Sequence, residues 1–164
     1  MMTPPARADS ITVTVTAPSA CRPGSSPVKL KLAQSILSHA LTEARARRLP
    51  PLSVVILDER SQIKLSVTED GASAFRQKIA FAKANGALGM GMSTGQLFDL
   101  FERGVLPDRF AMSIMFAADG GFAPQPGGEL IVWEGEVAGA IGISGASSDE
   151  DEVVARTALA LSLK

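Results

Sequence analysis

The chain has 164 residues, 46% of them hydrophobic, which is enough to build the core of one domain. Its 16 Lys and Arg residues are balanced by 17 Asp and Glu residues, so the formal net charge is −1, and no nucleic-acid partner is expected because the basic surface that binds phosphates is missing. The single cysteine, Cys21, excludes an intramolecular disulfide and a metal site with several cysteine ligands.

Residues 1–28 contain five prolines around the segment ITVTVTA at residues 11–17. This alternation is typical of a strand, whereas a secretory signal needs about 7–15 uninterrupted apolar residues. We therefore expect an N-terminal arm at residues 1–28 that carries a candidate edge strand, and a single domain at residues 29–164. No apolar run approaches the roughly 20 residues of a membrane span, so we expect a cytoplasmic protein without a membrane partner.

The first helix is predicted to begin near Leu30, because apolar residues then recur at the spacing of a helix with one buried face. Pro50 and Pro51 end this pattern. His39 lies roughly 150° from the centre of the apolar stripe, so we expect it on the outer face of the helix.

A hairpin is predicted next, with a buried strand at residues 52–57, a turn at 58–61 and a second strand at 62–67. A second helix is expected to start near Ala72. Its inner stripe is predicted to contain Phe75, Ile79, Ala82 and Gly86.

Ser93 and Gln96 match a capping box, in which the two side chains satisfy free backbone donors at a helix start. A short helix is therefore expected at residues 96–102. The apolar segment at residues 111–117 is predicted to be a strand.

The last part of the chain is predicted to form a hairpin between residues 129–134 and 136–144, with the turn at Gly135. Ser147 and Glu150 form a second capping box at the start of a terminal helix. The core-facing residues of that helix are predicted to be Val154, Ala158 and Leu161.

The order of these elements decides the predicted fold class. Helix, two strands, one or two helices, three strands and a final helix do not form a repeating strand–helix alternation. We expect an α/β (α+β) fold with a mainly antiparallel sheet of about five strands, packed with helices.

Three glycines precede the terminal helix, Gly139, Gly142 and Gly145, and an acidic run at residues 149–152 opens it. The glycine spacing differs from that of a dinucleotide-binding loop, and the carboxylates would repel a bound anion. Close packing of the strand and capping of the helix are the favoured interpretations.

The block GGELIVWEGEVAGAIGISGASSDEDEVVA at residues 127–155 resembles the GlcG/HbpS-like family of small haem-binding or haem-degrading domains. The resemblance extends to VVILD at residues 54–58, DGA at 70–72 and AKA at 82–84. It implies a profilin-like sandwich, haem as the candidate cofactor, held on or between subunits, and a homo-oligomer.

His39 is the only histidine and therefore the only imidazole that can bind haem iron, although an ordinary surface histidine is the simpler interpretation. Lys83 is predicted at the margin of the buried stripe, where its stem packs while its ammonium reaches a groove; it is a candidate contact for a haem propionate, although an ordinary surface lysine is the simpler interpretation. Thr68 replaces the arginine expected from the family pattern, which removes a bidentate anchor for a carboxylate.

The alternative is an isomerase or lyase that acts on a small carboxylated metabolite. Asp70 would accept a proton, Lys83 would stabilise an enolate-like charge, and Ser144 would donate into the same cleft or simply cap a turn. A structural or regulatory subunit is the third hypothesis. No nucleophile, base and orienting acid can be assembled from the sequence, so haem binding is the leading hypothesis.

Overall fold

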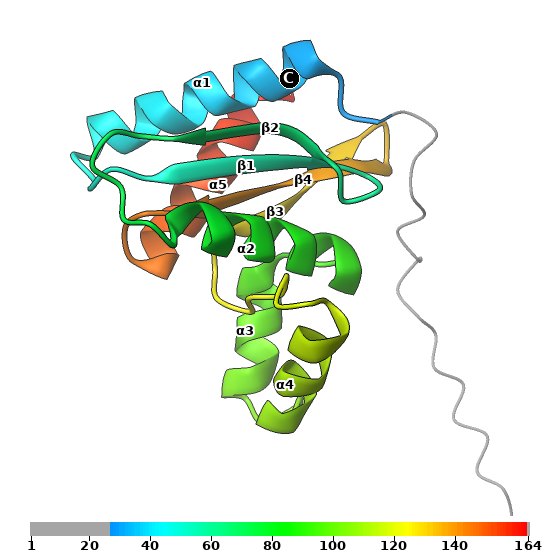
Figure 1. Cartoon of the computed structure of the whole chain (residues 1–164). Helices are drawn as coiled ribbons and strands as arrows, with labels where there is room; N and C mark the ends of the chain where they lie inside the picture. Colours follow the sequence, from blue (N-terminus) through cyan, green and yellow to red (C-terminus); the bar gives the residue numbers. More distant parts are fainter. Residues whose placement is uncertain (1–26, 164) are drawn as a thin grey trace, which may run out of the picture.

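The computed structural model describes residues 27–163, and the predicted edge strand at residues 11–17 lies outside this part of the chain (Figure 1). Val28, which the sequence places in the arm, belongs to the packed structure. Its side chain is buried, and its backbone N–H donates to the carbonyl of Ala138 at 2.9 Å. The packed structure therefore includes the last residue of the predicted arm.

The described residues form five helices and four strands, which confirms the α+β class. They are α1 (Leu30–Ala46), β1 (Ser53–Asp58), β2 (Ile63–Thr68), α2 (Arg76–Met90), α3 (Thr94–Glu102), α4 (Asp108–Ala117), β3 (Gly128–Trp133), β4 (Glu136–Ser144) and α5 (Ser148–Ser162). The strands pair antiparallel in the order β2-β1-β4-β3. Within residues 27–163, none of the helices has the length and apolar character needed to cross a membrane.

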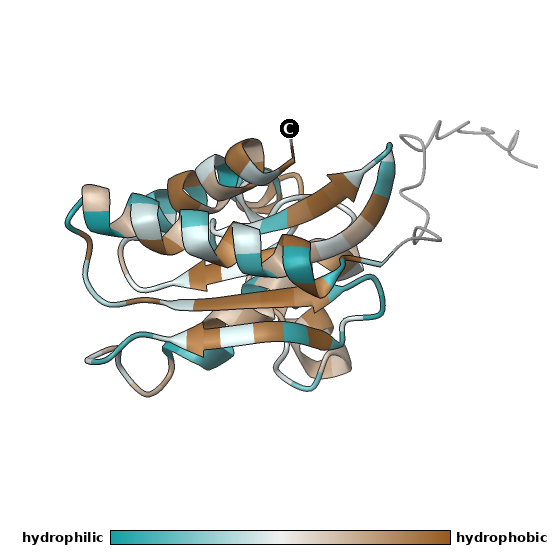
Figure 2. Cartoon of the chain, turned by 90° about the horizontal axis from the view of Figure 1, so that it is seen from above, coloured by the Kyte–Doolittle hydropathy of each residue, from teal (hydrophilic) through white to brown (hydrophobic). Residues whose placement is uncertain are grey.

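The sheet lies between two helical layers, with α1 and α5 on one face and α2 on the other (Figure 1). Successive strand residues point to opposite faces. Val54 and Ile56 therefore join the α1–α5 core, whereas Val55 and Leu57 pack against α2. Figure 2 shows that hydrophobic residues follow the strands, while the turns that join them are mostly hydrophilic. A strand buried on both faces explains the continuous apolar run of β1.

The strand predicted at residues 111–117 is wrong, because this segment belongs to helix α4. Within residues 27–163, the sheet consequently has four strands and not five. Pro107 occupies the N-cap and Asp108 lies in the first turn, where a carboxylate complements the helix dipole. Alanine and methionine favour the helix here, and no regular alternation of apolar and polar residues opposes it.

The second helix, α2, begins at Arg76 and not near Ala72. Phe75 is therefore outside the helix and 69% exposed, contrary to the prediction. Ala82 and Gly86 are buried, as expected.

Both capping boxes are present, at Ser93 with Gln96 and at Ser147 with Glu150. In α5, Val154 and Ala158 are buried as predicted. Leu161 is 45% exposed, which contradicts the prediction, and the neighbouring Leu159 faces the core in its place.

Gly142 allows the backbone of α2 to lie directly on the sheet. A Cβ atom at this position would lie 1.9 Å from the carbonyl oxygen of Ala80, a distance that no packing can accommodate. At Gly145, a Cβ would lie 2.2 Å from the Cβ of Leu52. These contacts confirm that the glycines of this segment serve close packing.

Candidate functional site

His39 lies where α1 packs beside α5. Its ring nitrogen Nδ1 is 2.8 Å from the hydroxyl of Ser162 on α5, and the residue is half-buried. The prediction of an outer, solvent-facing position is wrong because α5 covers that flank of α1. With the proton on Nδ1, the other nitrogen, Nε2, carries the lone pair that a metal requires.

A groove with a volume of about 560 Å³ opens beside this contact, between the start of α1 and the β3–β4 hairpin. Ser162 lines the groove as well as contacting His39, and Ser35, one helical turn before His39, lies on the same wall. The remainder of the lining is apolar or charged, with two cations and one anion: Pro27, Val28, Leu32, Ala138, Trp133, Lys29, Lys31 and Glu134. A planar anionic molecule fits this combination, since Trp133 offers a ring and the lysines offer positive charge.

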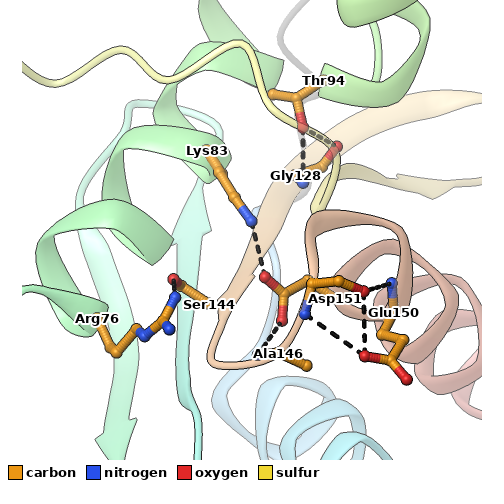
Figure 3. A network of polar contacts seen from close by, with 9 residues as sticks. Arg76, Lys83, Thr94, Gly128, Ser144, Ala146, Glu150 and Asp151 are labelled. Carbon is orange, nitrogen blue, oxygen red and sulfur yellow. Dashed lines mark hydrogen bonds and ion pairs between the residues drawn. The ribbon is translucent and has the colours of Figure 1, made fainter. Parts of the chain in front are cut away.

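Lys83 has a different environment on α2. Its ammonium donates a hydrogen bond to Asp151 at 2.9 Å, and each side chain is 2% exposed (Figure 3). The predicted reach of the ammonium into an open groove is therefore wrong. Burial lowers the pKa of Lys83 and raises the pKa of Asp151, while the attraction between the two charges opposes both shifts.

From the acidic run at residues 149–152, the sequence predicts that Asp151 contributes to capping of the helix. Its ion pair with Lys83 is not apparent from the sequence. Glu150 completes the capping box, whereas Asp151 faces inward and also accepts a hydrogen bond from the N–H of Ala146 at 3.1 Å (Figure 3). A signal for this role is present in the sequence. Asp151 stands four and seven residues before Ala155 and Ala158, and therefore on the buried face of α5.

Two glycines close the space around this ion pair. A Cβ at Gly127, which has a φ of 119°, would lie 2.9 Å from the Lys83 Nζ and equally close to the Asp151 Cβ. The N–H of Gly128 donates to the hydroxyl of Thr94 at 2.8 Å, which holds the start of β3 against α3 (Figure 3). The main chain at Gly127 and Gly128 thus seals the Lys83–Asp151 ion pair.

Ser144 is buried at the end of β4 and accepts a long hydrogen bond of 3.4 Å from Arg76 (Figure 3). Its pairing partner Ser53 exchanges a hydrogen bond with Thr68 at 2.9 Å, so three hydroxyl residues form a row across β4, β1 and β2. Arg76 is a residue that sequence reasoning misses. It brings a guanidinium to the sheet face next to α2, although the arginine expected at Thr68 is missing.

Asp70 is exposed in the connection between β2 and α2. Within residues 27–163, no hydrogen bond joins it to Lys83 or Ser144. The structure therefore brings together Lys83, Asp151, Arg76 and Ser144, but it does not add Asp70 or His39 to them. Because the Lys83 ammonium is buried against Asp151, the geometry does not favour its use on an enolate or a propionate.

Several solved structures share this fold. The PduOC:haem complex matches with a TM-score of 0.72 and 23% identity, over 82% of this chain and 94% of that one. HbpS matches with a TM-score of 0.69 and 24% identity, over 90% and 98%. The ORFY protein of Klebsiella pneumoniae matches with a TM-score of 0.75 and 19% identity, over 85% and 92%. No curated protein matches the chain.

The family is decided by a direct match to the sequence. The model of the family described as "Haem degrading protein HbpS-like" matches residues 28–160, which include every helix and strand except the last two residues of α5. The resemblance inferred from the glycine-rich C-terminal block is confirmed, and the chain belongs to the HbpS-like family.

Proposed function

We propose that this protein binds haem in the groove between α1 and the β3–β4 hairpin, with His39 as the iron ligand. The observation that carries the proposal is that Ser162 both contacts the Nδ1 of the only histidine and lines the groove. A hydrogen bond to the second ring nitrogen is the usual means by which a protein orients a metal-binding imidazole. Membership of the HbpS-like family supports haem as the ligand class.

The groove offers what a tetrapyrrole needs. Its volume of about 560 Å³ lies within the range of roughly 300–1,000 Å³ that is typical of ligand sites. Trp133 can stack on a porphyrin face, and the apolar side chain of Leu32 excludes water from it. Lys29 and Lys31 are the cations for the propionates, in place of the buried Lys83.

A haemin titration followed by absorbance tests this proposal. The wild-type chain should give a saturable Soret shift, and His39→Ala should weaken the affinity and change the spectrum, because the iron loses its ligand. Trp133→Ala should also weaken binding. Phe75→Ala is the matched control, since Phe75 is an exposed aromatic residue outside the groove and its loss should have no effect.

Two results would reject the site. If His39→Ala and Trp133→Ala both leave the affinity and the Soret band unchanged, haem binds elsewhere or nonspecifically. If the wild-type chain gives no saturable shift, haem is not its ligand. The cytoplasmic location and the homo-oligomer remain predictions. An isomerase or lyase activity on a small carboxylated metabolite is not favoured, because the ammonium assigned to it is buried.

A further inference from the structure

Arg76, in the first turn of α2, has surroundings unlike those of the other arginines. Within residues 27–163, it is half-buried and every other arginine is exposed. Some of the exposed arginines nevertheless form ion pairs, among them Arg45 with a carboxylate at 2.6 Å and Arg156 with one at 2.9 Å. No ion pair joins Arg76 to a carboxylate in this part of the chain. The most buried of these guanidinium groups is therefore one that lacks a counter-charge.

The hydrogen-bonding capacity of the Arg76 guanidinium is also largely unused. A guanidinium carries five N–H donors in a planar fork. Among the described residues, the side chain makes one hydrogen bond, the long one of 3.4 Å to the hydroxyl of Ser144 (Figure 3). Ser144 is buried, so this contact holds one side of the guanidinium against the sheet. The other donors remain available to an acceptor that enters from solvent.

The charged groups around Arg76 do not neutralise it. Burial is the main influence on the pKa of Lys83 and of Asp151, and the positive charge of Arg76 is a smaller influence that lowers both pKa values. The Asp151 carboxylate is already paired with Lys83 at 2.9 Å. Glu69, at the end of β2, is paired with Arg45. The charge of Arg76 is consequently uncompensated within the described chain.

Neutral hydroxyl groups line the sheet beside Arg76. Ser144 pairs with Ser53 across β4 and β1, and Ser53 pairs with Thr68 across β1 and β2, so the three side chains point to one face. This is the face that α2 covers, because Ser53 is two residues before Val55, which packs against α2. Thr68 is exposed, so the row of hydroxyls runs from the buried Ser144 to solvent. An anion that enters along this row meets no negative charge from it.

We propose that Arg76 and Ser144 bind a small monocarboxylic acid, on the opposite face of the sheet from the haem groove. The guanidinium offers two parallel N–H donors to the two carboxylate oxygens. The hydroxyl of Ser144 accepts from Arg76 and still has its own proton to donate to the ligand. One uncompensated positive charge matches one carboxylate, whereas a phosphate dianion would bring a second charge that nothing in the row balances. The site is independent of haem binding.

The first experiment is a titration of the full chain with sodium acetate, followed in amide NMR spectra at constant ionic strength. Acetate should shift the Ser144 amide signal saturably, and acetamide, which has a similar shape and no charge, should not. Arg76→Gln should weaken acetate binding by about tenfold or more, because the ion pair and its hydrogen bonds are lost. Arg103→Gln is the matched control, since it removes an exposed arginine at the end of α3 and should leave the affinity unchanged.

Three further variants test the arrangement of the site. Arg76→Lys keeps the charge but loses the two-donor fork, so it should bind acetate with an affinity between those of the wild type and Arg76→Gln. Ser144→Ala should weaken binding by a few-fold, because one donor to the carboxylate is lost. His39→Ala should bind acetate as the wild type does, which separates this site from the haem groove.

Three outcomes would overturn the proposal. One is a wild-type chain whose amide signals show no saturable shift with acetate. Another is an unchanged acetate affinity in folded Arg76→Gln or, if that variant does not fold, in both Arg76→Lys and Ser144→Ala. The third is displacement of acetate by an equal concentration of sodium phosphate, which would mean that the site takes anions in general and does not select a carboxylate.

Discussion

Two regions of the molecule hold polar side chains in opposite ways. The Lys83–Asp151 pair joins α2 to the first turn of α5; both side chains are 2% exposed, and the glycines at the start of β3 close the space around them. On the α1 face, His39 is half-buried next to a groove. Removing one partner of a sealed pair leaves the other charge buried and uncompensated, whereas a partly open imidazole remains available to a ligand. Substitutions in the first region should therefore affect mainly stability, and substitutions in the second should affect mainly binding.

The largest expected effect comes from breaking the sealed pair. Lys83→Ala should lower the free energy of unfolding by about 3–5 kcal/mol, because it leaves the Asp151 carboxylate buried without a counter-charge. Chemical denaturation at neutral pH measures this. Lys78→Ala, on the exposed side of the same helix, is the control and should change the value by no more than about 0.5 kcal/mol. Similar losses for both variants would show that the pair is not sealed.

A smaller loss of stability is expected from Gly127→Ala. The new Cβ would press on the Lys83 Nζ and the Asp151 Cβ, and the φ of 119° is unfavourable for any residue with a side chain. We expect a loss of about 1–3 kcal/mol. Gly135→Ala is a matched control, since it has a φ of 81° but nothing within 4 Å of its Cβ. An equal loss at both glycines would mean that backbone strain alone, and not the packing around the ion pair, limits this position.

The pH dependence of the sealed pair should be visible against the double variant Lys83→Met with Asp151→Leu. Burial raises the pKa of Asp151, so the wild-type chain should lose stability relative to the double variant as the pH rises from about 3.8 through that pKa. Burial lowers the pKa of Lys83, so the relative stability should be regained between that pKa and about 10.5.

The difference in unfolding free energy between the two chains should thus be least favourable to the wild type near neutral pH. Denaturation curves at intervals of one pH unit measure it, and the slope should not exceed about 1.4 kcal/mol per unit. A maximum near neutral pH would instead show that the attraction between the charges outweighs their burial.

The smallest effect on stability, with the clearest effect on binding, is expected for Ser162→Ala. Losing the half-buried hydroxyl that bonds to His39 and, at 3.5 Å, to Ser35 should lower the free energy of unfolding by only about 0.5–1.5 kcal/mol. The haemin affinity should fall by about 10–100-fold, because the imidazole loses the group that orients it. Ser66→Ala on β2 is the control for both measurements. If Ser162→Ala leaves the haemin affinity unchanged, Ser162 does not contribute to haem binding.

Local sequence patterns were sufficient for most of the framework. The two capping boxes, the β3–β4 hairpin and the β1 strand depend on residues within a few positions of each other, and all are present. The error at α4 arose because a short apolar segment suits a strand and a helix alike, and Pro107 and Asp108 were the helix signals that should have decided it.

The sequence by itself determined the family, the α+β class and the approximate positions of the helices and strands, because these depend on short-range propensity, capping and periodicity. Only the tertiary structure decided the environments of the polar residues. Lys83 and Asp151 are 68 positions apart in the sequence, and His39 and Ser162 are 123 apart. Whether such a side chain is sealed or open depends on which helix packs beside it, and no local pattern carries that information.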